Sequence, residues 1–242
     1  MDFEKDLRAV ETNIPGLIVF DLPVHGDNRG WFKENWQRAK QTALGLPDFG
    51  PVQNNISFNA KKGVTRGIHA EPWDKLISLA TGRILGAWVD LREGPTFGTS
   101  FTLEMGPEKA VFVPRGVGNS YQTLEPDTAY TYLVNDHWSP DASYSFLNLA
   151  DETAAIEWPI PLTDVEISPK DLAHPRLADV TPIPPNSCDV PVRVALLPEA
   201  HAGWAGRPGL SGSRDGRSWS PRFTVTGLTL DGAPIEASSG DA

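Results

Sequence analysis

The sequence predicts an all-β domain with a few short helices, and two observations support this prediction. Glycine and proline contribute 22 residues each, and they interrupt the first three quarters of the chain too often for long helices. Between these interruptions, apolar and polar residues alternate with a period near two, which is typical of half-buried strands. A length of 242 residues suits one large β domain followed by a shorter segment.

Strand-like runs follow one another along this domain. The clearest pair lies between Lys75 and Arg92, where apolar residues flank a Thr81-Gly82-Arg83 turn. Their spacing is typical of neighbouring strands in a sandwich or barrel. Helical patterns are confined to Glu4–Glu11 and Trp36–Leu44, and neither exceeds about three turns. The other predicted strands are Ile14–Leu22, Trp31–Trp36, Thr99–Met105, Ala110–Pro114 and Thr128–Val134.

The composition changes after Pro185. The segment 186–242 lacks lysine and is rich in glycine, proline and serine, and within it only Val192–Leu197 and Phe223–Leu230 resemble strands. We therefore predict a domain over residues 1–185 and a poorly ordered tail over residues 186–242.

Charge and cysteine content exclude several classes of function. The chain has 31 acidic and 21 basic residues, a net charge of −10 and a pI near 4.9, so nucleic acids and anionic membranes are unfavourable partners. The single Cys188 cannot form an internal disulfide or a cysteine-rich metal site. Neither a signal peptide nor a long apolar run is recognisable, and we expect a cytoplasmic protein.

The densest group of chemically active residues lies between Gly63 and Lys75. Continued to Gly82, its spacing is similar to the first cupin signature, and Pro114–Asn119 resembles the second. This resemblance implies a cupin-type double-stranded β-helix, or jelly roll. Metal-binding cupins carry His, His, Glu and His at four ligand positions, which here hold His69, Glu71, Lys75 and Asn119. Because an ammonium group repels a divalent ion, we expect neither a metal nor another cofactor.

Several further motifs between Ile14 and Asp171 occur in the order found in dTDP-4-dehydrorhamnose 3,5-epimerases, and the chain resembles that family. The matching segments and residues are Asp27–Glu34, Gln53–Ser57, Arg66–His69, Val89–Arg92, Pro95–Gly98, Tyr132, Trp138, Pro140, Asp151, Glu157–Pro159 and Ser168–Asp171. Relatives fused to a reductase suggest that residues 186–242 are a remnant of such a domain.

The resemblance implies an isomerase of dTDP-L-rhamnose biosynthesis that inverts carbons 3 and 5 of dTDP-4-keto-6-deoxyglucose. Removing a proton beside a ketone requires a base, a cation for the enolate oxygen and an acid on the opposite ring face. By the family pattern, His69 is the base and Asp151 orients its ring. Lys75 stands beside the enolate oxygen, and Tyr132 returns a proton from the other face.

The remaining matches imply a nucleotide-sugar site. Arg29 and Arg66 are the expected diphosphate ligands, and Trp138 occupies the position of an aromatic residue that stacks on thymine. The other expected substrate contacts are Phe32, Glu34, Gln53, Asn55 and Asn119. In relatives the N-terminal strand that carries the Arg29 motif reaches the neighbouring subunit, so a homodimer is implied.

Structural roles remain open for some of these residues. Asp151 could cap a turn, Tyr132 could be an ordinary strand aromatic, and Arg92 is expected to form a structural ion pair. Asn119 replaces the histidine usual in the second motif, and Glu71 replaces a common glutamine. An epimerase acting at one carbon, or on a related dTDP-ketosugar, therefore remains an alternative. A non-catalytic cupin that binds a nucleotide sugar is another.

Overall fold

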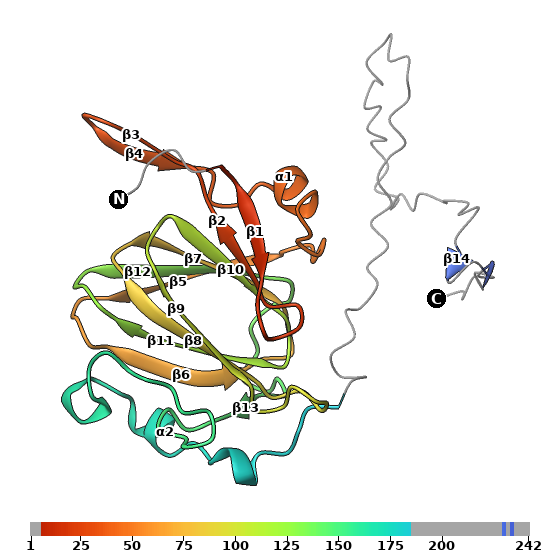
Figure 1. Cartoon of the computed structure of the whole chain (residues 1–242), viewed down its shortest axis with the longest axis vertical. Coiled ribbons are helices and arrows are strands. Elements are labelled where there is room, and N and C mark those ends of the chain that lie inside the picture. Colours follow the sequence, from red (N-terminus) through yellow and green to blue (C-terminus); the bar gives the residue numbers. More distant parts are fainter. Residues whose placement is uncertain (1–5, 185–228, 231–232, 235–242) are drawn as a thin grey trace, which may run out of the picture. The chain divides into compact units, whose positions relative to one another are not determined.

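The structure is a computed structural model that describes residues 6–184, 229–230 and 233–234 (Figure 1). The chain divides into two compact units, Met1–Val192 and Arg193–Ala242. In the second unit, the described residues form the strand pair β14 (Thr229–Leu230) and β15 (Ala233–Pro234). The predicted strand Val192–Leu197 and most of Phe223–Leu230 lie outside the described residues. The boundary at residue 185 and the remnant hypothesis stay predictions.

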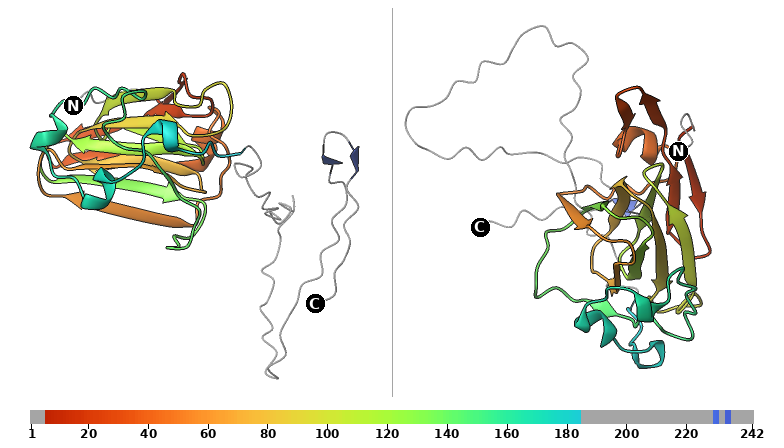
Figure 2. Two further views of the ribbon diagram at one scale, coloured as in Figure 1. Left: turned by 90° about the horizontal axis from the view of Figure 1, so that it is seen from below. Right: turned by 90° about the vertical axis from the view of Figure 1, so that its left-hand side faces the viewer.

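The first unit is built from two antiparallel sheets that lie one over the other (Figure 2). In spatial order, the six-stranded sheet contains β1 (Arg8–Glu11), β2 (Ile18–Asp21), β10 (Lys109–Val113), β7 (Lys75–Thr81), β12 (Thr128–Val134) and β5 (Gln53–Asn59). The five-stranded sheet contains β13 (Ser145–Phe146), β6 (Thr65–Ala70), β11 (Val117–Thr123), β8 (Ile84–Asp90) and β9 (Ser100–Met105). This arrangement confirms the predicted all-β, cupin-type jelly roll.

Several smaller elements lie outside the two large sheets. The strands β3 (Val24–Asp27) and β4 (Gly30–Lys33) form a hairpin that projects from the body at the upper left of Figure 1. The helices among residues 6–184 are α1 (Arg38–Thr42), α2 (Pro169–Leu172) and two 3₁₀ turns, Leu162–Asp164 and Leu177–Asp179. None of the helices in these described ranges is long and apolar enough to cross a membrane.

The turn at Gly82 moves the chain from one sheet to the other. Both predicted strands are present, but β7 belongs to the six-stranded sheet and β8 to the five-stranded sheet, so they do not pair with each other. Gly82 has a φ of +81°, and a Cβ atom there would lie 2.1 Å from Thr128 Oγ1. Only glycine suits both constraints.

The prediction of a helix over Glu4–Glu11 is wrong. Residues Arg8–Glu11 form β1, which pairs antiparallel with β2 from Arg8 opposite Asp21 to Glu11 opposite Ile18. Leu7 and Ala9, two residues apart, both pack against a core cluster that includes Phe20, which is the period of a strand. The second predicted helix is confirmed as α1, where the Gln37 side chain accepts a hydrogen bond from Lys40 N.

The barrel interior has an apolar part and a polar part. One core cluster contains Ile77 and Val111 from the six-stranded sheet and Trp88 from the five-stranded sheet, all buried. Tyr121 and Tyr130 belong to the same cluster, and they also line a polar cavity. The core therefore forms one wall of the candidate site.

Candidate active site

A cavity of about 180 Å³ lies inside the barrel between the two sheets. Its walls come from β5, β6, β7, β11, β12 and the segment between β6 and β7. It is lined by Ser57, Arg66, Gly67, His69, Glu71, Lys75, Asn119, Tyr121, Tyr130 and Tyr132. The cavity brings together five of the predicted site residues, namely Arg66, His69, Lys75, Asn119 and Tyr132.

The register of the paired strands explains why these residues lie close together. His69 on β6 lies opposite Asn119 on β11, and Tyr132 on β12 lies opposite Asn55 on β5. His69 therefore belongs to the five-stranded sheet, whereas Tyr132 belongs to the six-stranded sheet. A ligand in the cavity meets the imidazole from one sheet and the phenol from the other.

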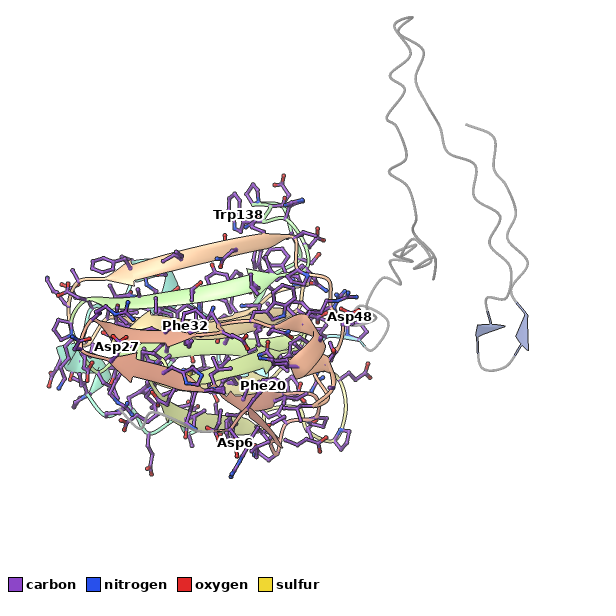
Figure 3. The ribbon with its side chains drawn as sticks, turned by 90° about the horizontal axis from the view of Figure 1, so that it is seen from above. Asp6, Phe20, Asp27, Phe32, Asp48 and Trp138 are labelled. Atoms are coloured by element: carbon purple, nitrogen blue, oxygen red, sulfur yellow. The ribbon has the colours of Figure 1, made fainter. Side chains whose placement is uncertain are left out.

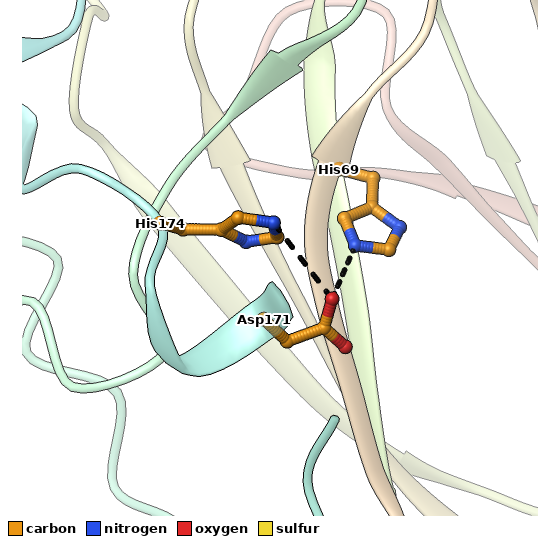
Figure 4. Close-up of side chains that lie close together, drawn as sticks. All are labelled: His69, Asp171 and His174. Carbon is orange, nitrogen blue, oxygen red and sulfur yellow. Dashed lines mark hydrogen bonds and ion pairs between the residues drawn. The ribbon is translucent and has the colours of Figure 1, made fainter. Parts of the chain in front are cut away.

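The carboxylate paired with His69 is that of Asp171 (Figure 4). His69 Nε2 lies 3.0 Å from Asp171 Oδ1, and Gly67 N donates to Asp171 Oδ2 at 3.3 Å. Burial alone raises the pKa of Asp171, but the hydrogen bond and positive charge of His69, with the Gly67 N–H, bring that pKa below its usual 3.8. An ionised carboxylate only accepts hydrogen bonds, so Nε2 carries the hydrogen and Nδ1 is free to accept a proton.

The prediction that Asp151 orients His69 is wrong. Asp151 Oδ1 accepts hydrogen bonds from Thr153 N at 3.0 Å and Ala154 N at 2.8 Å, while its Oδ2 accepts one from Leu177 N at 2.7 Å. This buried carboxylate caps backbone groups, as the structural alternative proposed. The Asp151 carboxylate thus bonds to the turn and to the start of the Leu177–Asp179 segment, and among the described residues it makes no hydrogen bond to His69.

Asp171 was present among the matched motifs, but no role was assigned to it. The signal lay in Ser168-Pro169, because a serine followed by proline is a typical helix start. Ser168 Oγ accepts a hydrogen bond from Asp171 N at 3.1 Å, which begins α2 and fixes Asp171 in its first turn. The helix start thus positions the carboxylate against β6.

Lys75 is a buried cation held by an acidic partner. Its ammonium group forms an ion pair with Glu71, and the two side chains are 4% and 14% exposed. The pair compensates the cost of placing a charge inside the barrel. Lys75 therefore presents positive charge to the cavity that it shares with His69 and Tyr132.

Tyr132 and Asn119 are suited to donating hydrogen bonds. Burial, followed by the negative charge of Glu71, raises the pKa of Tyr132 to about 12. Tyr132 consequently keeps its proton at neutral pH. Tyr130 Oη donates to Asn119 Oδ1 at 3.2 Å, which leaves the Asn119 Nδ2 group to donate to a ligand.

The other cavity residues support a polar ligand at the mouth. Arg66 is exposed, and its Nε donates to Asn59 Oδ1 at 3.1 Å, so the far end of its guanidinium remains available to an anion. Gln53 and Asn55 lie on β5, the strand that also carries the cavity residue Ser57, but they do not line the cavity themselves. A 2.8 Å hydrogen bond joins their side chains. Arg92 instead forms the expected structural ion pair, with Asp90 at 2.7 Å.

Besides Gln53 and Asn55, four predicted substrate contacts do not line the cavity within one chain. Arg29 pairs with Asp27 on the projecting hairpin, and Phe32 on the same hairpin is 65% exposed. Glu34 pairs with Lys40. Trp138 is 62% exposed in the loop after β12, and Figure 3 shows it at the surface, away from Phe32.

Three side chains could offer ligand atoms to a metal ion. The ligand atoms of His69, Asp171 and His174 all lie within 4.8 Å of one another. A bound ion would have to displace the hydrogen that His69 shares with Asp171. This donor set therefore favours a proton-transfer pair over a metal centre.

A jelly roll whose cavity is lined by an imidazole, an ammonium and a phenol is the architecture of a cupin-type enzyme. Comparison with known proteins gives the family. The family model described as dTDP-4-dehydrorhamnose 3,5-epimerase matches residues 11–179. The chain belongs to this family of carbohydrate epimerases.

Individual relatives agree with this assignment. The Streptococcus pyogenes "Protein RmlC homolog" is 50% identical over 76% of this chain and 96% of its own length. The Salmonella typhimurium dTDP-4-dehydrorhamnose 3,5-epimerase is 32% identical over 70% of this chain and 94% of its own length. The structure of RmlC from Streptococcus suis in complex with dTDP-D-xylose is 49% identical, with a TM-score of 0.73, and covers 76% of this chain and 98% of that chain.

Proposed function

We propose that this protein converts dTDP-4-keto-6-deoxyglucose to dTDP-4-keto-L-rhamnose by inverting carbons 3 and 5, as a step in dTDP-L-rhamnose biosynthesis. The observation that carries the proposal is the single cavity in which His69, Lys75 and Tyr132 meet. A protein that only binds a nucleotide sugar needs the anion ligands, but it has no need for a base, an enolate cation and an acid together.

His69 removes the proton. With Asp171 holding the hydrogen on Nε2, the lone pair of Nδ1 accepts hydrogen from a carbon beside the ketone. The resulting imidazolium remains paired with the Asp171 carboxylate, which stabilises the charge as it develops. The electrons of the C–H bond move into the ketone to form an enolate.

The enolate oxygen is stabilised by groups that are already in place. Lys75 supplies a positive charge whose position is fixed by Glu71, and Asn119 Nδ2 supplies a hydrogen bond that does not depend on pH. Preorganised donors favour the transition state more than the neutral ketone, because negative charge grows on the oxygen during the reaction.

Tyr132 returns a proton to the opposite face of the carbon. It projects from the six-stranded sheet, opposite the sheet that carries His69, and this placement supports inversion. A phenol with a pKa near 12 is protonated at neutral pH and is still far more acidic than a carbon beside a ketone. His69 then gives up its proton before the second carbon reacts.

The nucleotide is held at the mouth of the barrel. Arg66 binds the diphosphate there, Gln53 and Asn55 contact the nucleotide and sugar, and Trp138 stacks on thymine. Arg29, Phe32 and Glu34 contribute from the projecting hairpin of a second subunit, which makes the enzyme a homodimer. The exposed position of Arg29 and Phe32 in one chain supports this arrangement.

Product analysis tests the proposed function. Purified protein incubated with dTDP-4-keto-6-deoxyglucose is expected to yield the L-rhamno product, identified by its proton couplings in NMR after chemical reduction of the ketone. A product inverted at one carbon selects the single-carbon alternative. Tight binding of the nucleotide sugar without any turnover selects the non-catalytic binding protein.

A further inference from the structure

His174 is a buried imidazole next to the carboxylate that holds the base (Figure 4). Its side chain is 5% exposed, and its Nε2 lies 3.8 Å from Asp171 Oδ1, the same oxygen that pairs with His69. This separation is too long for a hydrogen bond. Within the described part of the chain, neither ring nitrogen of His174 makes a hydrogen bond of standard geometry, although buried polar atoms are usually satisfied.

Aromatic packing holds this ring in place. His174 stacks on Phe146 with centroids 4.7 Å apart, and its edge meets His69 at 5.3 Å. Phe146 also meets His69 edge-on at 5.6 Å. The three rings form one cluster beside Asp171, whose side chain is only 8% exposed.

The charges around His174 favour its neutral form. Burial lowers the pKa of His174 below 6.5, and the neighbouring His69 lowers it further. The opposing influences are Asp171 and the backbone groups of Gly67 and Leu147, and they do not reverse the shift. The ammonium of Lys170 lies across Phe146, 5.2 Å from that ring. One carboxylate thus faces two imidazoles, and the buried one, His174, favours its neutral form.

We propose that His174 is a positioning residue that limits how strongly Asp171 holds protonated His69. The inference rests on the proposed function, in which His69 must take up and release a proton at each carbon. A neutral His174 with hydrogen on Nε2 directs that N–H toward Asp171 Oδ1 and partly satisfies its charge. His69 then holds its proton less strongly and returns to the basic form more readily.

Two variants separate this effect from simple packing. His174→Phe keeps a flat buried ring but removes both nitrogens, whereas His174→Gln keeps a donor. In the Phe variant we expect the titration midpoint of His69, followed by NMR of the ¹⁵N-labelled imidazole, to rise by about half a pH unit. The pH at which substrate deuterium exchange falls off on the acid side should rise as well. The Gln variant should lie between the Phe variant and the unmodified protein.

Repeating the titration with Asp171→Asn provides the matched control. If His174 acts through the carboxylate, His174→Phe should no longer move the His69 midpoint once Asp171 is replaced. An unchanged midpoint in folded His174→Phe protein overturns the inference, and where that variant does not fold, an unchanged midpoint in folded His174→Leu protein, which also lacks a donor, does so. The NMR titration needs no substrate, so its failure is distinguishable from failure of the proposed epimerase activity.

Discussion

Asp151 and Asp171 are both buried, yet their carboxylates have different partners. Asp151 accepts three backbone hydrogen bonds, whereas Asp171 joins a backbone N–H to the His69 ring. Replacement of each by asparagine therefore separates a structural role from a positioning role.

Asp171→Asn is expected to lower kcat by roughly 10²-fold or more, because the amide stabilises an imidazolium poorly and can select the wrong tautomer of His69. Asp151→Asn should leave kcat of the folded protein nearly unchanged. It should lower the free energy of unfolding by about 1–3 kcal/mol, since an amide NH₂ faces a backbone donor. Steady-state kinetics and urea unfolding of both variants check this contrast, and a reversed pattern would contradict the assignment of Asp171.

Tyr132→Phe tests the proposed acid, Tyr132, separately from the proposed base, His69. His69 remains intact, so exchange of the substrate C–H with solvent should continue, while formation of inverted product falls by about 10²–10⁴-fold. NMR can follow both quantities in one sample. Equal losses of exchange and inversion would argue against a role for Tyr132 confined to reprotonation.

At the scale of elements, some strands could be predicted closely, whereas β5, β6 and β11 were not among the predicted strands. A period of two and bounding glycines located β7, β9, β10 and β12 to within about one residue. The short β1 was mistaken for a helix because a four-residue strand shows little periodicity, and its strand geometry depends on pairing with the distant β2.

The candidate site was also predicted only in part. Motif order identified the residues of the cavity, but it could not decide which aspartate contacts His69. Asp171 lies 102 residues from His69 along the chain, and only the tertiary packing of α2 against β6 brings the two together. The same packing places His174 beside Asp171 and His69.

The projecting β3–β4 hairpin is anchored by Lys33. Its ammonium donates to Leu79 O at 2.7 Å and Pro107 O at 2.8 Å. Burial lowers the pKa of Lys33 from 10.5 to about 8, although the charge of Glu108 opposes the shift. Between these two pH values the unfolded chain binds more protons than the folded chain, so this residue makes the free energy of unfolding rise with pH.

Lys33→Met should therefore flatten the pH dependence of stability between about pH 8 and 10. Urea unfolding at several pH values measures this slope, and Lys62→Met, at an exposed lysine, serves as the control. The account of Lys33 fails if the Met variant retains the full slope.

At the scale of the whole molecule, the proposed site needs two chains. The edge strand β5 exposes Ile56 (68%) and Phe58 (60%), and apolar side chains on a sheet edge suit an interface. The β3–β4 hairpin, which includes the exposed Arg29 and Phe32, projects from the body (Figure 1). Both features support a homodimer in which each hairpin completes the neighbouring site.

Subunit mixing tests this arrangement. Arg29→Ala and His69→Asn proteins are each expected to be nearly inactive. When they are unfolded and refolded together in equal amounts, hybrid dimers should contain one site with both native residues, giving about a quarter of the native activity. If each site is built from a single chain, the mixture should regain no activity.

The most direct test of the central claim is deuterium incorporation from D₂O into dTDP-4-keto-6-deoxyglucose, measured by NMR at carbons 3 and 5. The account predicts label at both carbons with the native protein and a loss of about 10²–10⁴-fold in the rate of labelling with His69→Asn. Labelling at an undiminished rate by folded His69→Asn protein, or no labelling by native protein that binds the substrate, would contradict it.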